Sequence, residues 1–386
     1  MYNNFLSSSF NLKGNNRKEL LNDLQVFAKG TFTRAIEPYD LVLYSIVSVK
    51  NDGFIVIELN PDEMDIHSIA PRNNESILKN GYNFVPFKDF IRLGIDMDLI
   101  EDIRNEGFFL KYRGKVILPA EGCANLISKA CKFGRVPTEP SPVRDMYLAY
   151  LLGEADPFKI MLRSNGHISK LIDIVSEKHK HIDQSDMTLK ALDLISDECP
   201  EAQVTFYSLD HKKSVVKLEF TDLKVSKKSK RRYVFTPAAI ITISDDTDTK
   251  SSVQGCIGME GRFIKLDNSI SLCLPEKEIR ARLRRMSEEM IAICDHIASL
   301  DADTLRDRRE SIIELANAAD LPSVGQKVFR MYEDYINAID DISEADVFAE
   351  LMSFPSRLSY IAGKEVPQYV TDKAERLVGQ MLQKYA

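Results

Sequence analysis

The spacing of apolar and polar residues changes twice along the chain. Up to about residue 35 the sequence is polar, and only residues 19–27 show a helical spacing. Short β-branched runs then alternate with helical patterns until residue 275, after which helical periodicity alone remains. We therefore predict an α+β fold with three parts. These are a flexible N-terminal arm (1–35), a core of mixed, mainly antiparallel β-meander with helices (36–275), and an all-α C-terminal region (276–386).

Three polar turns divide pairs of β-branched runs in the predicted core. The turns are Asn51-Asp52-Gly53, Arg113-Gly114 and Ser164-Asn165-Gly166. Asn, Asp and Gly tolerate the positive φ angles of tight hairpin turns, so we expect a β-hairpin at each. Four further strands are expected at 204–209, 215–221, 233–244 and 252–266.

One long helix in the C-terminal region has a regular apolar seam. Its members are spaced alternately four and three residues apart: Ile279, Leu283, Met286, Met290, Ile293, Ile297 and Leu300. This spacing predicts a helix that packs along a single partner, either within the chain or in another chain. We expect a homo-oligomer or a protein partner through the 279–300 helix.

Composition limits the class of protein. The 386 residues carry a net charge of −7, with 44% hydrophobic and 28% charged residues, as in ordinary globular proteins. The six cysteines form no CxxC pair, which is typical of a reducing compartment. No apolar run reaches 18 residues, and the first twenty residues lack a signal-peptide pattern. We expect a cytoplasmic protein without membrane contact.

The strongest local feature is a cationic segment beside aromatic residues. It contains Lys224, Lys227, Lys228, Lys230, Arg231 and Arg232, directly before Tyr233 and Phe235. Cations neutralise phosphates and aromatic rings stack on bases, the two requirements for binding single-stranded nucleic acid. Arg262 and Lys265 follow nearby and are expected to contact the same phosphates. The alternative is a solvated loop that protects a sheet edge.

Other charged clusters favour structural roles. Arg280, Arg282, Arg284 and Arg285 lie within helical reach of Glu276, Glu278, Glu288 and Glu289, which predicts pairing inside the helix. His179, His181 and Asp183 would share one side of an extended segment, as metal ligands do. However, the sequence shows no second ligand cluster near them, so a solvated strand exit is the favoured interpretation.

Motifs of common enzymes are absent. The sequence contains no GxxxxGK[ST], GxSxG or HExxH pattern, and we nominate no catalytic residue and no cofactor. Gly255, Gly258 and Gly261 resemble a phosphate loop only in spacing. Their neighbours read as strand, so a bulged or kinked strand is predicted there.

Residues 117–266 resemble, by pattern, the phage and plasmid family called domain of unknown function 932. The resemblance lies in Ile117-Leu118-Pro119-Ala120, in Phe133-Gly134-Arg135-Val136-Pro137, in the segment from Ile174 to Asp183 and in the strand from Thr236 to Asp245. The later strand departs from the family, because Gly255-Cys256 and Met259-Glu260-Gly261 lack its Arg and Asn. The resemblance implies an origin in a mobile element and supplies no catalytic residues.

Three hypotheses follow. The leading one is a non-enzymatic phage or mobile-element protein that binds single-stranded nucleic acid and anneals strands as a multimer, in the bacterial host cytoplasm if phage-encoded. The second is a phage structural, assembly or host-interaction protein that acts through its helical tail. The third is a metal-dependent hydrolase at His179, His181 and Asp183.

Overall fold

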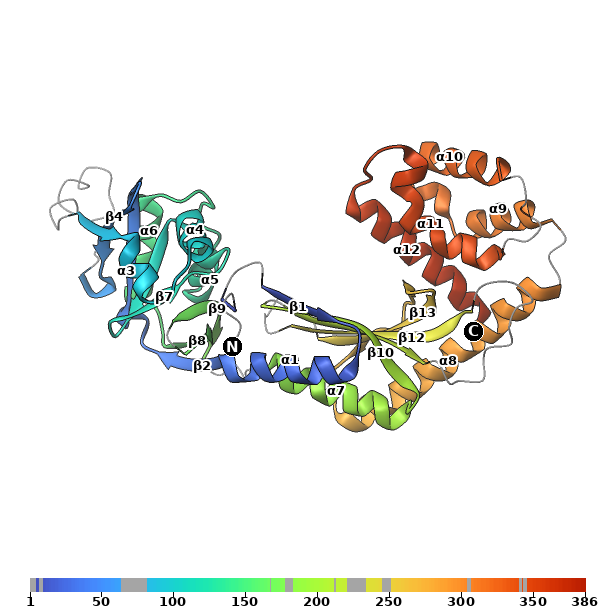
Figure 1. The fold of residues 1–386 in the computed structure, drawn as a ribbon, viewed down its shortest axis with the longest axis horizontal. Helices are drawn as coiled ribbons and strands as arrows, with labels where there is room; N and C mark the ends of the chain where they lie inside the picture. The colour runs from blue at the N-terminus through green and yellow to red at the C-terminus, as the bar shows by residue number, and fades with distance from the viewer. Residues whose placement is uncertain are drawn as a thin grey trace.

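The fold is α+β, as predicted, and consists of two β-sheets with a C-terminal group of helices (Figure 1). This computed structural model describes residues 5–6, 10–63, 82–166, 168–177, 183–211, 213–220, 234–244, 251–303, 307–339, 342 and 346–386. The first sheet and its helices form the lobe drawn at the left of Figure 1, and the second sheet lies beside the C-terminal helices.

The first sheet has eight strands in the order β2-β8-β9-β7-β6-β3-β4-β5. Their bounds are Thr31–Ile36 (β2), Leu41–Lys50 (β3), Gly53–Leu59 (β4), Asn83–Pro86 (β5), Phe108–Tyr112 (β6), Lys115–Leu118 (β7), Phe158–Ser164 (β8) and Ser169–Ser176 (β9). Neighbouring strands are antiparallel except β7 and β9, which run parallel. Helices α3 (Phe87–Arg92), α4 (Met97–Glu106), α5 (Cys123–Ala130) and α6 (Pro142–Gly153) belong to this lobe.

The three predicted hairpins are confirmed. Strands β3 and β4, β6 and β7, and β8 and β9 each pair in antiparallel register. At the second turn Arg113 and Gly114 have φ angles of 48° and 77°, as a tight hairpin requires. Helix α5 follows the second hairpin and begins at Cys123, directly after Gly122, whose backbone is in the left-handed region.

The first sheet is strongly curled. Strand β3 lies five positions from β2, so a flat sheet with strands about 4.8 Å apart would separate them by about 24 Å. The chain passes from Ile36 to Leu41 in five steps, which span about 18 Å at most. The sheet must therefore bend until β2 approaches β3 and β6, and this bend creates a concave face.

The second sheet has the main path β1-β10-β11-β12-β13-β14, with β15 paired to β13. Its strands are Asn11–Gly14 (β1), Ala202–Asp210 (β10), Lys213–Phe220 (β11), Thr236–Ser244 (β12), Ser252–Met259 (β13), Arg262–Lys265 (β14) and Ile270–Ser271 (β15). Helices α7 (Gln184–Glu198) and α8 (Glu276–Asp303) pack on it, and α1 (Arg17–Gly30) lies beside α7.

The strand expected over 252–266 is two strands joined by a tight turn. Glu260 and Gly261 have φ angles of 48° and 75°, so the chain reverses and β14 pairs back onto β13. The predicted bulge is wrong, because Gly255 and Gly258 pair with β12 in continuous register. Gly255 is needed for packing, since a Cβ there would lie 2.5 Å from the Asn268 side chain.

The N-terminal segment is not the flexible arm that its polar composition suggested. Strand β1 pairs with β10 of the second sheet, and β2 pairs with β8 of the first. Helix α1 between them buries Leu20, Leu24 and Phe27. The segment therefore connects both sheets, and the predicted core of 36–275 holds two separate sheets in place of one.

The apolar seam of α8 closes within the chain. Ile279, Met290, Ile293 and Ile297 are fully buried and Leu283 and Met286 nearly so, in one cluster with residues of the second sheet. The expectation of an oligomer or partner through this seam is therefore not supported, because the chain's own sheet occupies it.

The remaining helices are α9 (Arg308–Ala318), α10 (Gln326–Asn337), α11 (Val347–Ala362) and α12 (Gln368–Leu382). Short 3₁₀ turns occur at Pro38–Asp40 (η1), Pro61–Glu63 (η2), Leu321–Val324 (η5) and Gln383–Tyr385 (η7).

Candidate functional site

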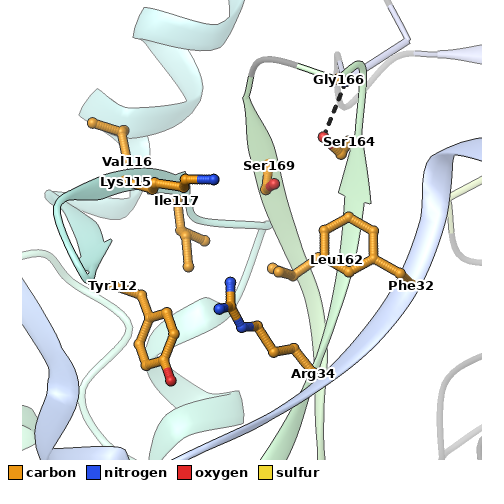
Figure 2. Close-up of a pocket in the computed structure, with 10 residues that line it drawn as sticks. All are labelled: Phe32, Arg34, Tyr112, Lys115, Val116, Ile117, Leu162, Ser164, Gly166 and Ser169. Carbon is orange, nitrogen blue, oxygen red and sulfur yellow. Dashed lines mark hydrogen bonds between the residues drawn. The ribbon is translucent and has the colours of Figure 1, made fainter.

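The concave face of the first sheet holds a hollow of about 290 Å³ (Figure 2). Residues from five strands and from the turn between β8 and β9 surround it: Phe32, Arg34, Tyr112, Lys115, Val116, Ile117, Leu162, Ser164, Gly166 and Ser169. Its volume lies near the lower limit for small-molecule sites, which start at about 300 Å³. The hollow therefore suits a ligand the size of one nucleotide.

The alternation of strand side chains places the polar groups here. Phe32 and Arg34 lie two residues apart on β2 and share the face of the buried Ile36. Tyr112 and Lys115 are cross-strand partners at the end of the β6-β7 hairpin. Figure 2 shows the Arg34 guanidinium in the middle of the hollow and the Lys115 ammonium directed toward Ser169.

The curl of the sheet is held by arginine contacts on Tyr112. The Arg34 guanidinium carbon lies 4.8 Å from the centre of the Tyr112 ring, although four strand positions separate β2 from β6. Arg113 lies 5.1 Å from the same ring and forms a 3.4 Å ion pair with Asp40 after β2. Tyr112 is consequently only 4% exposed, so its ring anchors the cations and offers no free stacking surface.

The hollow carries positive charge that the described part of the chain does not neutralise. Neither Arg34 nor Lys115 forms an ion pair with a described carboxylate, and both side chains are exposed. Phe32 is 41% exposed and presents an aromatic surface at the same site. Two cations beside an exposed ring can bind a phosphate and stack on a base.

The two serines of the hollow differ in their bonding. The Ser164 hydroxyl donates to the carbonyl of Ile168 at 2.7 Å and accepts from the Gly166 amide at 3.1 Å, so it stabilises the turn (Figure 2). Ser169 faces the hollow from β9 and makes no comparable turn contact in the described structure. Its hydroxyl is the group best placed to bind a ligand oxygen beside Lys115.

The opposite face of the β6-β7 hairpin also carries a cation, but with a carboxylate nearby. Lys111 lies there with its ammonium 4.2 Å from the centre of the Tyr44 ring. The Tyr44 hydroxyl donates to Glu58 at 2.8 Å, and burial together with this contact raises the pKa of Tyr44. A carboxylate thus accompanies the cation on that face, whereas the hollow has none among its lining residues.

Most of the predicted nucleic-acid site falls outside the described residues. This applies to Lys224, Lys227, Lys228, Lys230, Arg231, Arg232 and Tyr233. Phe235 is described and only 3% exposed, so the expectation that it stacks on bases is wrong. It belongs to the main hydrophobic core, because it leads directly into the central strand β12.

Arg262 and Lys265 contact the C-terminal helices. Arg262 donates to the Ser353 hydroxyl on α11, and Lys265 lies 3.8 Å from Glu375 on α12. These two cations attach β14 to the helices, and they are not part of the hollow in the first sheet. Their expected contact with the same phosphates as the segment 224–232 stays a prediction, and the sequence does not indicate their helical partners.

The metal hypothesis gains no support from the described residues. His179 and His181 lie outside them, and Asp183 is the N-cap of α7, where it accepts from the Ser185 and Asp186 amides at 2.8 and 3.0 Å. Within the described ranges, no group of three His, Cys, Asp or Glu side chains could hold a metal ion.

Two of the four arginines at the start of α8 pair with acids inside the helix, as predicted. Arg280 contacts Glu276 at 3.0 Å and Arg282 contacts Glu278 at 2.6 Å, both one helical turn apart. Arg284 and Arg280 also reach Glu198 at the end of α7. These cations therefore stabilise the packing of two helices and are not free for an anionic ligand.

Sequence reasoning missed Phe32 and Arg34 because it assigned them to the flexible arm. The stretch from Thr31 to Ile36 does alternate small and large side chains, which is a strand signal. Nothing local indicates that this strand would meet β6, since the meeting depends on the curl of the whole sheet.

Comparisons with known proteins give no relative for this chain: no family model, curated protein or solved structure matches it. In the described part of the chain, none of the helices has the length and apolar character needed to cross a membrane.

Proposed function

We propose that the protein binds single-stranded nucleic acid and seats one nucleotide in the hollow of the first sheet. One observation carries the proposal: Arg34 and Lys115 converge, without described acidic partners, beside the exposed ring of Phe32. Phosphate neutralisation supplies affinity, and stacking on an aromatic ring tolerates any base. The proposed role is non-enzymatic.

Each group has a distinct part in the proposed mechanism. Arg34 offers a planar donor set that suits phosphate oxygens, and its contact with Tyr112 orients the guanidinium. Lys115 adds a second positive charge from the adjacent hairpin, and the Ser169 hydroxyl provides a further donor. Phe32 supports the base. Because the Arg34 guanidinium is already held against the Tyr112 ring, this side chain loses little conformational freedom on binding.

The wider hypothesis extends this site to a phage or mobile-element protein that anneals complementary strands as a multimer. The resemblance of residues 117–266 to the phage family motivates the origin, and the cationic segment 224–232 remains a second predicted contact with the strand. A multimer would need a surface other than the α8 seam, since that seam is buried inside the chain.

A second candidate function is that of a phage assembly or host-interaction protein acting through the helical tail. Tyr360 on α11 is 77% exposed and Tyr369 on α12 is 74% exposed. Tyrosine is enriched in protein interfaces, so these side chains favour a protein partner on the tail. Light scattering that detects assembly in the absence of nucleic acid, and its loss in a Tyr360→Ala, Tyr369→Ala variant, would support this function.

Fluorescence anisotropy with a labelled 20-nucleotide single strand tests the proposed function. Affinity should fall as salt rises from about 50 to 200 mM, with a log-log slope of about −0.7 for each phosphate contacted. Arg34→Gln and Lys115→Gln should each weaken binding and flatten that slope by about 0.7. Lys111→Gln is the matched control, since Lys111 lies on the same hairpin but on the opposite face.

Two results would count against the proposal. The first is the absence of binding by the unmodified protein at low salt. The second is a double variant, Arg34→Gln with Lys115→Gln, that binds as tightly as the control. If neutralising the six cations of 224–232 abolished binding while the double variant bound normally, the hollow would be excluded as the principal site.

A further inference from the structure

The charged residues that flank β2 are mainly negative beyond the end of the strand and positive at its start. Beyond the end of the strand, three carboxylates outnumber one guanidinium: repulsion by Glu37 first, then burial and the charges of Asp40 and Asp62, raise the pKa of Tyr39, while Arg113, which pairs with Asp40 at 3.4 Å, lowers it. At the start of the strand stands Lys29, the exposed basic residue in the last turn of α1, which forms no ion pair with a described carboxylate.

This reversal restricts how a polyanion can cross the hollow. A strand that ran through it in both directions would pass, at one end, Glu37, Asp62 and the Asp40–Arg113 pair, whose net negative charge repels phosphates. At the other end it would pass Lys29, where phosphates are attracted. The charges therefore favour continuation of a nucleic-acid strand at the Lys29 end over the end with the acids.

The number of cations in the hollow also fits the charge of a phosphate at the end of a nucleic-acid strand. An internal phosphodiester carries one negative charge, whereas a terminal phosphomonoester carries about 1.5 to 2 at neutral pH. Arg34 and Lys115 place two positive charges in a hollow that holds about one nucleotide. Phe32 lies on β2 between Arg34 and the end of β2 that follows Lys29, so a base stacked on it would lie on the side where the nucleic-acid strand continues.

We propose, on the basis of the proposed function, that the hollow recognises the phosphorylated terminus of a single strand. The terminal phosphate is bound by Arg34 and Lys115 with the Ser169 hydroxyl, and the first base stacks on Phe32. The following nucleotides leave past Lys29. A protein with this property binds strand ends in preference to strand interiors.

Competition binding tests the proposal with ligands of one base sequence. The ligands are a linear 10-nucleotide strand with a 5′-phosphate, the same strand with a 3′-phosphate, the strand with neither, its circular form, and adenosine monophosphate. We expect one of the two phosphorylated strands to bind at least about tenfold more tightly than the unphosphorylated and circular strands. Arg34→Gln and Lys115→Gln should remove this preference, and Lys111→Gln should retain it.

The outcomes separate this inference from the function on which it rests. Equal affinity for the linear and circular strands, with binding still dependent on Arg34, would overturn end recognition and leave single-strand binding intact. Adenosine monophosphate competing as well as the phosphorylated strand would overturn it in favour of a free-nucleotide site. Absence of binding to every strand would sink the proposed function itself.

Discussion

Replacement of Phe32 by alanine separates the proposed stacking role from a structural role. The ring is 41% exposed at the rim of the hollow, so its removal opens no internal cavity and should lower the free energy of unfolding by less than about 1 kcal/mol. Stacking of a base on an aromatic ring contributes about 1–3 kcal/mol to single-strand binding. The variant should therefore bind single strands about 5- to 150-fold more weakly while remaining folded.

The second aromatic residue provides an internal comparison. Phe235 is only 3% exposed within the main core, so Phe235→Ala should lower the free energy of unfolding by about 3–5 kcal/mol. Its folded fraction should bind single strands with unchanged affinity. The two substitutions thus have opposite expected effects, one on binding and the other on stability.

Urea unfolding followed by circular dichroism measures stability, and fluorescence anisotropy at fixed salt measures binding. Phe32→Tyr is the matched control, because it retains an aromatic ring and should bind within about threefold of the original protein. A Phe32→Ala variant that is folded and binds as tightly as Phe32→Tyr would refute the stacking argument. A large loss of stability in Phe32→Ala would show that the ring has a structural role instead.

Three further predictions concern the stability and reactivity of the fold. Gly379→Ala should lower the free energy of unfolding by about 2–3 kcal/mol, measured by urea unfolding. The added Cβ would lie 2.0 Å from the Lys265 carbonyl oxygen and would overpack α12 on β14. Unchanged stability would contradict this contact. Met290→Ala should lower the free energy of unfolding by about 2–5 kcal/mol, because the side chain is fully buried. The molecular mass measured by light scattering should stay unchanged. A change in oligomeric state would contradict a seam closed within the chain. Burial raises the pKa of Cys131 to about 11, so thiolate formation and alkylation at this residue, followed by mass spectrometry, should increase about tenfold per pH unit between pH 7 and 10. At pH 7 Cys131 should react more slowly than the exposed Cys273, and equal rates would contradict its burial.

Features that depend on neighbouring residues could be predicted from the sequence. The hairpin turns at Asn51-Asp52 and Arg113-Gly114 follow from short polar segments between β-branched runs. Only the second turn uses the expected positive φ angles, since Asn51, Asp52 and Gly53 have none. The pairing of Arg280 with Glu276 follows from helical spacing. Glu260-Gly261 is a turn of the same kind, but it was missed because the apolar pattern on both sides suggested one continuous strand.

The candidate site could not be predicted because its residues meet only through the arrangement of the sheet. Arg34, Tyr112 and Ser169 come from segments far apart in the chain, and none of them stands in a recognisable motif. The polar composition before residue 36 concealed a strand that pairs with β8. Phe235 shows the converse: an aromatic residue beside a cationic segment suggested stacking, whereas the side chain is buried in the main hydrophobic core.

The sequence by itself determined the α+β class, the three hairpins and the long apolar face of α8, because periodicity and turn chemistry act over a few residues. The tertiary structure decided where those elements meet. It directed the α8 seam against the chain's own second sheet, and it curled the first sheet until Arg34 reached Tyr112. The short connection between β2 and β3 forces that curl, and the curl brings the two cations and Phe32 together in one hollow.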